Sequence, residues 1–238
     1  MTALSHTNIS YAVKDGRRGY LWPIVTGCDN PVAICLTRDT CWARTLIARN
    51  LPGMKSHYNP TFGPQYNSDV LHVPESVREP ALFCVAFTGD LGQAYWFQQR
   101  ELVQHVACSC PQHMFLFLTK RPEVWQMHNP WPNNCWLGTS ITGAESPEMQ
   151  QARYWALLAV EGGHRWLSYE PTLGPLAIDE FPGLVWLAIG PQTGKGATRP
   201  KPMWIADAQA TAREAGIPVY LKPECAKLGF GRCEELPW

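Results

Sequence analysis

The sequence lacks the features that would place a protein in a membrane or outside the cytoplasm. It has no apolar stretch close to the roughly 20 residues that a transmembrane helix needs. Its first ten residues, MTALSHTNIS, lack the charged region and apolar run of a secretory signal. Its nine cysteines are odd in number and show no disulfide framework. We therefore expect a cytoplasmic protein without a membrane partner, in which clustered cysteines indicate metal or redox chemistry.

The chain also lacks a net charge, because 20 basic residues balance 20 acidic ones. A global electrostatic attraction to nucleic acid or to a membrane surface is thereby excluded, although a local basic patch is not. Lys195–Lys201 is a flexible basic stretch of this kind, and it fits either a DNA backbone or an ordinary solvated loop. Eleven tryptophans are many for 238 residues; most should lie in the core, while flat rings also suit stacking on bases.

Short apolar runs alternate with longer segments that fit helices, which is typical of a parallel α/β fold. The predicted strands are Tyr20–Thr26, Leu82–Thr88, Met114–Thr119, Cys135–Ser140, Arg165–Tyr169, Leu184–Ile189 and Val219–Leu221. The predicted helices are Trp42–Asn50, Gly92–Ala107, Pro147–Glu161 and Met203–Ala215. We predict a single α/β domain over residues 1–238, an incomplete (β/α) TIM-like barrel of about six or seven parallel strands. An irregular insertion is expected at about 52–80 and a tail at about 223–238.

Three cysteines lie in one loop between the first predicted strand and the first predicted helix. Six residues separate Cys28 from Cys35, and five separate Cys35 from Cys41. Three thiolates from one loop can hold three irons of a [4Fe–4S] cluster and leave the fourth iron open. A structural zinc site with His57 as fourth ligand, or three small buried side chains without metal, are the alternatives. The other six cysteines are expected to be core or surface thiols, with a second metal site as the alternative.

Polar residues follow the predicted strands, and parallel strands place their carboxyl ends at one edge of the sheet. Asp90 and Glu170 could act there as acid and base of a hydrolase, which would leave the cysteines unexplained. The cations Lys120, Arg121 and Lys222 fit either a substrate phosphate or carboxylate, or ion pairs with the two acids.

Several segments resemble a short, phage-associated branch of the radical S-adenosylmethionine superfamily that is related to spore photoproduct lyase. The segment LWPIVTGC at residues 21–28, followed by Cys35 and by CWA at 41–43, is similar to that branch's cysteine loop. Further similar segments are FLTKRP at 117–122, WLGTS at 136–140, WLSYEP at 166–171 with LGPL at 173–176, VWLAIGPQTG at 185–194 and AGIPVYLK at 215–222. The resemblance covers most of the chain.

This resemblance implies a radical enzyme that uses a [4Fe–4S] cluster and S-adenosylmethionine. The cluster ligands would be Cys28, Cys35 and Cys41. The implied cofactor-binding residues are Thr88, Gly89, Asp90, Ser140, Thr142, Gly190 and Gln192. The implied catalytic residues are Lys120, Glu170 and Lys222. Turn-forming hydroxyls are the alternative for Ser140 and Thr142, a helix cap for Asp90, and a structural ion pair for Glu170.

The phage context implies a nucleotide or DNA substrate, an external one-electron reductant, and the host cytoplasm as location if a phage encodes the chain. The sharpest expectation is an isomerase or lyase acting on a glycine-modified thymine in phage DNA, where an N-linked glycyl group becomes C-linked. The alternative function is a zinc- or cluster-stabilised phage protein that binds nucleic acid without catalysis.

Overall fold

The computed structural model describes residues 5–13, 16, 18–49, 57–194 and 196–238. Four parts of the sequence-based expectations lie outside these residues. They are residues 1–4 of the N-terminal segment, Asn50 of the first predicted helix, residues 52–56 of the predicted insertion, and Lys195 of the basic stretch.

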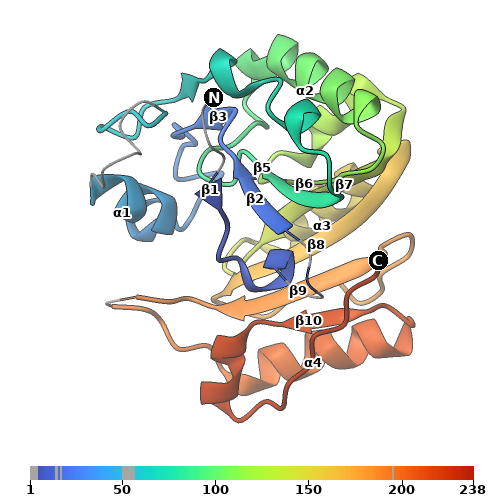
Figure 1. The fold of residues 1–238 in the computed structure, drawn as a ribbon. Coiled ribbons are helices and arrows are strands. Elements are labelled where there is room, and N and C mark those ends of the chain that lie inside the picture. Colours follow the sequence, from blue (N-terminus) through green and yellow to red (C-terminus); the bar gives the residue numbers. More distant parts are fainter. Residues whose placement is uncertain (1–4, 14–15, 17, 50–56, 195) are drawn as a thin grey trace.

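An eight-stranded sheet in the order β1-β2-β5-β6-β7-β8-β9-β10 forms the centre of the molecule. Its strands are β1 (Ser5–His6), β2 (Arg18–Trp22), β5 (Ala81–Val85), β6 (Met114–Thr119), β7 (Trp131–Ile141), β8 (Gly162–Thr172), β9 (Trp186–Pro191) and β10 (Val219–Leu221). Only β1 runs antiparallel to its neighbour; the other seven strands are parallel. The sheet curls into a half-barrel (Figure 1), which confirms the predicted incomplete TIM-like barrel.

The described residues form four α-helices, close to the predicted positions. They are α1 (Trp42–Ala48), α2 (Phe97–Ser109), α3 (Pro147–Leu158) and α4 (Pro202–Glu214). The start of α3 is capped, because the Ser146 hydroxyl accepts the Met149 N–H and Pro147 occupies the first turn. The prediction that α2 begins at Gly92 is wrong: residues 92–93 are a turn and Ala94–Trp96 form a 3₁₀ helix.

The prediction of one strand over Tyr20–Thr26 is also wrong. The chain leaves the main sheet after Trp22 because Pro23 has no N–H to donate to a strand ladder. It then forms β3 (Val25–Thr26), which pairs with β4 (Gln65–Tyr66) in a separate two-stranded sheet. The predicted irregular insertion therefore contains a strand, followed by short 3₁₀ helices at Ser68–Val70 and Pro74–Ser76.

The two faces of the sheet have different coverings. The outer face packs against buried side chains of the helices, such as Val103 of α2, Leu157 of α3 and Ile205 of α4. The inner face is lined with aromatic rings, and Tyr11 from a short 3₁₀ helix (Ser10–Val13) packs into it. The Tyr11 ring lies 5.2 Å from the Trp186 ring, measured between centroids. The N-terminal segment thus fills the open side of the half-barrel.

Both edges of the curled sheet end in antiparallel segments. The strand β1 covers the free edge of β2. At the other edge the predicted tail begins with a 3₁₀ helix (Pro223–Leu228) and then forms an antiparallel bridge from Glu234 to Tyr220 of β10. These segments occupy the backbone groups with which β2 and β10 would otherwise pair, so the barrel does not close. No helix among the described residues has the length and apolar character needed to cross a membrane.

Candidate functional site

The candidate site lies at the carboxyl mouth, which we define as the rim formed by the carboxyl ends of the parallel strands. The residues expected there follow the strands in order: Thr88, Gly89 and Asp90 after β5, Lys120 after β6, Ser140 and Thr142 at the end of β7, Glu170 in β8, Gly190 and Gln192 at the end of β9, and Lys222 after β10. Because parallel strands end on one side of a sheet, the fold brings these positions to one rim.

The cysteine loop, defined as residues 27–41, leaves β3 at this rim and leads into α1. Its three cysteines are half-buried and free of disulfides. Cys28 and Cys41 both pack against a small apolar cluster of α1 and Phe62. Cys35 lies close enough to Cys28 for its charge to raise the pKa of the Cys28 thiol. The three thiols therefore occupy the same side of the carboxyl mouth.

These thiols are not gathered around a single point. Among the described residues, no group of three His, Cys, Asp or Glu side chains is arranged to hold a metal ion. A cubane cluster differs from a single ion, because each thiolate binds a different iron and the sulfurs therefore stand further apart. Three free, half-buried thiols on one loop are a donor set that fits three irons of such a cluster.

The Cys28 thiol is protonated at neutral pH. Burial raises its pKa to about 11, and the Asp90 carboxylate and the neighbouring Cys35 act in the same direction. The backbone N–H of Asn30 and the positive charge of Lys120 oppose this increase. A thiol must lose its proton to bind a metal, so ligation at Cys28 would require the positive charge of the metal itself.

Asp90 connects the cysteine loop to the ends of two strands. One carboxylate oxygen accepts from the Thr119 hydroxyl at 2.6 Å and from the Gly92 N–H at 2.8 Å. The other accepts from the Asn30 side-chain amide at 2.6 Å. Asp90 therefore caps the turn that precedes α2, which resembles the capping alternative, and it also holds the loop two residues beyond Cys28.

Thr88 and Gly89, which follow β5, contact the same loop. The Gly27 N–H donates to the Thr88 carbonyl at 3.0 Å, and Gly27 forms a parallel bridge with Gly89. A Cβ at Gly89 would lie 2.9 Å from the carbonyl oxygens of Gly27 and Val25. Glycine is required at position 89 because the loop backbone approaches it so closely.

Ser140 and Thr142 make contacts within the fold. The Ser140 hydroxyl donates to the Glu170 carbonyl at 3.1 Å. The Thr142 side chain is buried, and its hydroxyl donates to Glu145 at 2.8 Å while accepting from the Ala144 N–H. This matches the turn-forming alternative for Thr142.

Glu170 and Lys222 form an ion pair on the inner face of the half-barrel, with 2.6 Å between Oε1 and Nζ. The Ser168 hydroxyl donates to the second carboxylate oxygen of Glu170. Burial alone lowers the pKa of Lys222, but the Glu170 carboxylate outweighs it and the net pKa is raised. The Cα of Gly190 faces this pair, since a Cβ there would lie 2.5 Å from Glu170 Oε1. Glu170 and Lys222 thus form with each other the ion pair that the sequence offered as one alternative.

Lys120 and Arg121 do not pair with Asp90. Among the described residues Lys120 makes no ion pair, although its charge lowers the pKa of Cys28. Arg121 donates through Nε to the Asn30 side-chain oxygen at 3.0 Å. Both cations therefore lie beside the cysteine loop, and Lys120 retains its capacity to bind an anion there.

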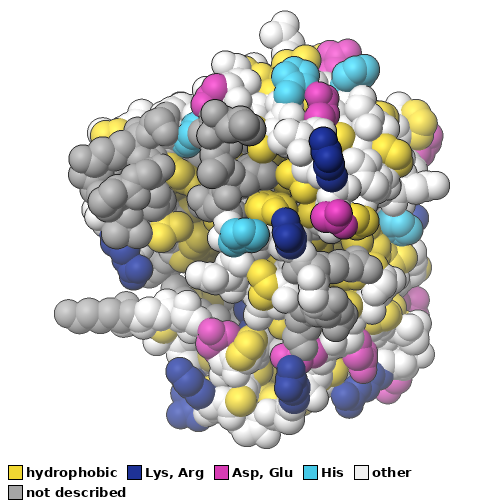
Figure 2. Space-filling model, viewed as in Figure 1, with side chains coloured by type: hydrophobic (Ala, Val, Ile, Leu, Met, Phe, Trp, Pro, Cys, Tyr) yellow, Lys and Arg dark blue, Asp and Glu magenta, His cyan; other side chains and the backbone are white. Residues whose placement is uncertain are grey.

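Gln192 links the end of β9 to the cysteine loop. Its amide donates to the Thr40 hydroxyl at 2.8 Å, next to Cys41, and its oxygen accepts from the Thr198 N–H at 2.8 Å. The described part of the basic stretch follows this contact, and the Lys201 ammonium lies 5.5 Å from the centre of the Trp204 ring. On the face shown in Figure 2, the Lys, Arg, Asp and Glu side chains of the described residues are scattered among one another.

The zinc alternative invoked His57, whose imidazole Nε2 lies 2.9 Å from the Asp69 carboxylate. The His57 carbonyl accepts from the Thr26 hydroxyl, which places this residue near the start of the cysteine loop. Of the other six cysteines, Cys108 is exposed, Cys233 is half-buried, and the rest are buried: Cys84, Cys110, Cys135 and Cys225. They form no metal-binding group within the described residues.

The comparisons with known proteins identify a family for this chain. The profile of a family described as "Protein of unknown function (DUF5131)" matches residues 7–227, which is most of the chain. The chain belongs to the DUF5131 family. No curated protein and no solved structure matches it. The family description assigns no activity to the carboxyl mouth.

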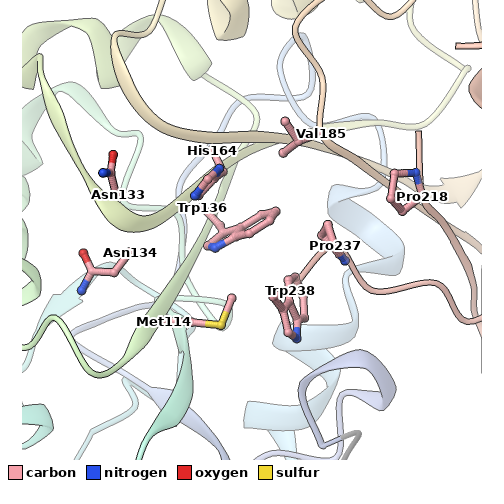
Figure 3. A pocket seen from close by; sticks show the side chains of 9 residues that line it. All are labelled: Met114, Asn133, Asn134, Trp136, His164, Val185, Pro218, Pro237 and Trp238. Carbon is pink, nitrogen blue, oxygen red and sulfur yellow. The ribbon is translucent and has the colours of Figure 1, made fainter. Parts of the chain in front are cut away.

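A cavity of about 590 Å³ in this DUF5131 chain lies at the other end of the half-barrel, which we call the amino end. The residues lining it come from the starts of the strands and from the C-terminal tail (Figure 3): Met114, Asn133, Asn134, Trp136, His164, Val185, Pro218, Pro237 and Trp238. The His164 ring stacks on Trp136 with centroids 4.4 Å apart, and Trp238 meets Trp136 edge-on. The Asn134 amide is bonded to carbonyls at the end of α2, so it is not available to a ligand.

Three residues at the mouth were missed by sequence reasoning. Asn30 lies in the cysteine loop, two positions after Cys28, and its proximity to the cysteine was the available signal. Arg153 and Glu145 form a buried ion pair, with 2.8 Å between Nη1 and Oε1. They belong to α3 and to the turn before it, where a charged residue in an amphipathic helix gives no signal that it is buried.

Proposed function

We propose that this DUF5131 protein is a radical S-adenosylmethionine enzyme with its cluster site in the cysteine loop. The observation that carries the proposal is the arrangement of the carboxyl mouth: three free thiols of one loop stand beside the ends of the parallel strands of a half-barrel. The similarity of the loop and of the strand-end segments to that superfamily supports the same conclusion.

Cys28, Cys35 and Cys41 would hold three irons of a [4Fe–4S] cluster, and the fourth iron would remain open for S-adenosylmethionine. When bound, the cluster and S-adenosylmethionine together would supply one-electron cleavage of the S-adenosylmethionine sulfonium, and with it a carbon radical able to abstract hydrogen from the substrate. The electron comes from an external reductant, and the proposed location is the cytoplasm, that of the host if a phage encodes the chain.

The residues of the chain would bind and orient the reactants. Lys120, beside the loop and without an ion pair among the described residues, would bind an anionic group of the cofactor or substrate. Glu170 and Lys222 form the floor of the mouth on the inner face, where they would hydrogen-bond the substrate. The buried aromatic cluster of the inner face would exclude water from the reacting atoms.

The proposed substrate is a nucleobase substituent, best a glycine-modified thymine in phage DNA whose N-linked glycyl group becomes C-linked. Nucleoside chromatography with mass spectrometry, after anaerobic incubation with modified DNA, S-adenosylmethionine and reductant, tests this step, because isomers of equal mass differ in retention. A rearranged nucleoside with unchanged mass is expected. Release of 5′-deoxyadenosine without any altered nucleoside would contradict this substrate and leave the cofactor proposal intact.

Iron and sulfide analysis after anaerobic reconstitution tests the cofactor proposal. Wild-type protein should bind about four irons and four sulfides per chain and absorb near 400 nm, with bleaching on dithionite addition. The Cys28→Ala, Cys35→Ala, Cys41→Ala triple variant should bind none. The matched control is Cys108→Ala with Cys233→Ala, which removes thiols outside the loop and should retain the cluster. A colourless wild-type protein containing one zinc would contradict the proposal and favour the non-catalytic alternative.

A further inference from the structure

The cysteine loop is tied to the rest of the carboxyl mouth near each of its cysteines. The three tie points are Asn30 bonded to Asp90, the Ile34 carbonyl bonded to Arg153, and Thr40 bonded to Gln192. Each point lies one or two positions from a cysteine, and each partner comes from a different part of the half-barrel. The middle one differs from the others, because its partner is a buried arginine that is itself held in an ion pair with Glu145.

The two terminal nitrogens of the Arg153 guanidinium have different partners: one donates to groups of the half-barrel and the other to the cysteine loop. Nη1 donates to Glu145 Oε1 at 2.8 Å and to the Ser140 carbonyl at 3.1 Å. Nη2 donates to the Ile34 carbonyl at 2.5 Å. The side chains of Arg153 and Glu145 are only 6% and 1% exposed. A planar guanidinium holds its N–H donors in a rigid fork and so serves several acceptors in fixed directions, whereas the three donors of a lysine ammonium rotate about a single nitrogen.

Glu145 is itself held in place, since it accepts from both the N–H and the hydroxyl of Thr142 at the end of β7. A buried ion pair of this kind costs desolvation and is by itself weak grounds for stability. In this structure the pair sets an orientation: the Glu145 carboxylate holds the Arg153 guanidinium so that Nη2 donates to the Ile34 carbonyl of the loop. The Ile34 carbonyl and the Cys35 N–H belong to one planar peptide unit, so fixing the carbonyl fixes the plane from which Cys35 projects.

We infer that Arg153, oriented by Glu145, is a positioning residue that holds the Cys35 segment of the cysteine loop in the geometry needed for ligation. The role of Cys35 as a ligand rests on the proposed function; the restraint that Arg153 places on the loop does not. Residues from α3 and the turn after β7 thereby set the position of a thiol more than 100 residues earlier in the chain.

Hydrogen exchange of the metal-free protein tests the restraint directly. The N–H groups of Ile34 and Cys35 both donate to the Pro31 carbonyl at 2.9 Å, so they exchange only when the loop opens. Arg153→Lys retains the positive charge beside Glu145 but removes the second guanidinium nitrogen, which donates to the Ile34 carbonyl. Loss of this charge-assisted bond should speed exchange in the peptide containing Ile34 and Cys35 by roughly tenfold. Glu145→Gln, which keeps the shape of the acid, should act in the same direction if the lysine variant folds poorly.

Arg165→Lys is the matched control. Arg165 also donates to two backbone carbonyls, those of Gly183 and Val160, but away from the cysteine loop. Its replacement should leave exchange at Ile34 and Cys35 unchanged. Equal exchange in wild-type protein, Arg153→Lys and Glu145→Gln would overturn the inference.

Iron and sulfide content after reconstitution separates this inference from the proposed function. Lower loading in Arg153→Lys than in Arg165→Lys, together with faster loop exchange, supports both. If wild-type protein holds no cluster, the proposed function fails, while faster exchange in Arg153→Lys still supports the restraint. Full loading in Arg153→Lys despite faster exchange would show that the restraint is not needed for ligation and would overturn the positioning role.

Discussion

The two ends of the half-barrel are built from opposite kinds of side chain. At the carboxyl mouth, polar groups from separate strands meet the cysteine loop through hydrogen bonds such as Asn30 to Asp90. At the amino end, Trp136, His164 and Trp238 pack ring against ring, and the tail closes over them (Figure 3). In barrels of parallel strands chemistry is concentrated at the carboxyl side and stability at the other. We therefore expect a substitution at one end of the half-barrel to leave the properties of the other end unchanged.

The largest expected effect is on stability, from Trp136→Ala at the amino end. Trp136 is 5% exposed and contacts two other rings, so its removal leaves a cavity that the rigid sheet cannot fill. We expect the free energy of unfolding to fall by about 3–5 kcal/mol, measured by urea denaturation.

The matched control is Trp155→Ala, whose ring is 60% exposed on α3 and whose loss should change stability by about 0.5 kcal/mol or less. Iron content per folded chain should be the same in both variants. If Trp136→Ala had normal stability but bound no cluster, the expectation that the two ends act independently would be wrong.

The next effect in size is expected from Lys222→Met at the carboxyl mouth. It leaves the Glu170 carboxylate, which is 14% exposed, without its cation. We expect a loss of about 1–3 kcal/mol in the free energy of unfolding. The double variant Glu170→Gln, Lys222→Met should recover most of the loss, because no unpaired charge remains.

This ion pair also predicts a pH dependence. The pKa of Lys222 is raised in the folded protein, so its contribution to stability is complete below the unfolded value of about 10.4 and is lost as the pH rises through the folded pKa. The stability difference between wild-type protein and the double variant should therefore shrink above about pH 10.4. A difference that stays constant through that range would show that the pair does not carry the stability.

The smallest effect is expected from Asp90→Asn, which tests the electrostatics of the cysteine loop in the metal-free protein. Thiol alkylation requires the thiolate, and the pKa of Cys28 is about 11 through burial and the charge of Asp90. Removing that charge should increase the alkylation rate of Cys28 at pH 8 by up to about tenfold, the effect of one pKa unit. Peptide mass spectrometry measures the rate at this residue.

Asp179→Asn is the control, because Asp179 is exposed and does not contribute to the pKa of Cys28. Faster alkylation of Cys28 in both variants would indicate that either substitution makes the cysteine loop more accessible, independently of the charge beside Cys28. An unchanged rate in Asp90→Asn would show that burial alone raises the pKa.

Local sequence patterns predicted the repeating strands and helices well. The start of α3 depends on Ser146 and Pro147, and the end of α4 on Gly216 at a positive φ, and such helix ends are set by a few neighbouring residues. The errors at β3 and at the start of α2 have different causes. Strand β3 pairs with Gln65–Tyr66, about forty residues away, which a local pattern does not reveal. The start of α2 is delayed by a local contact, because the Asp90 carboxylate accepts from the Gly92 N–H and holds a turn there.

The sequence by itself determined the class of fold, the cysteine loop and the order in which polar residues follow the strands, because alternation and spacing are local properties. Only the tertiary structure decided which of these residues meet. It paired Glu170 with Lys222, bound Asp90 to Asn30 and placed Arg153 against the loop carbonyl before Cys35. These contacts join residues 52 to 119 positions apart, and their geometry depends on how far the sheet curls before its edges are covered.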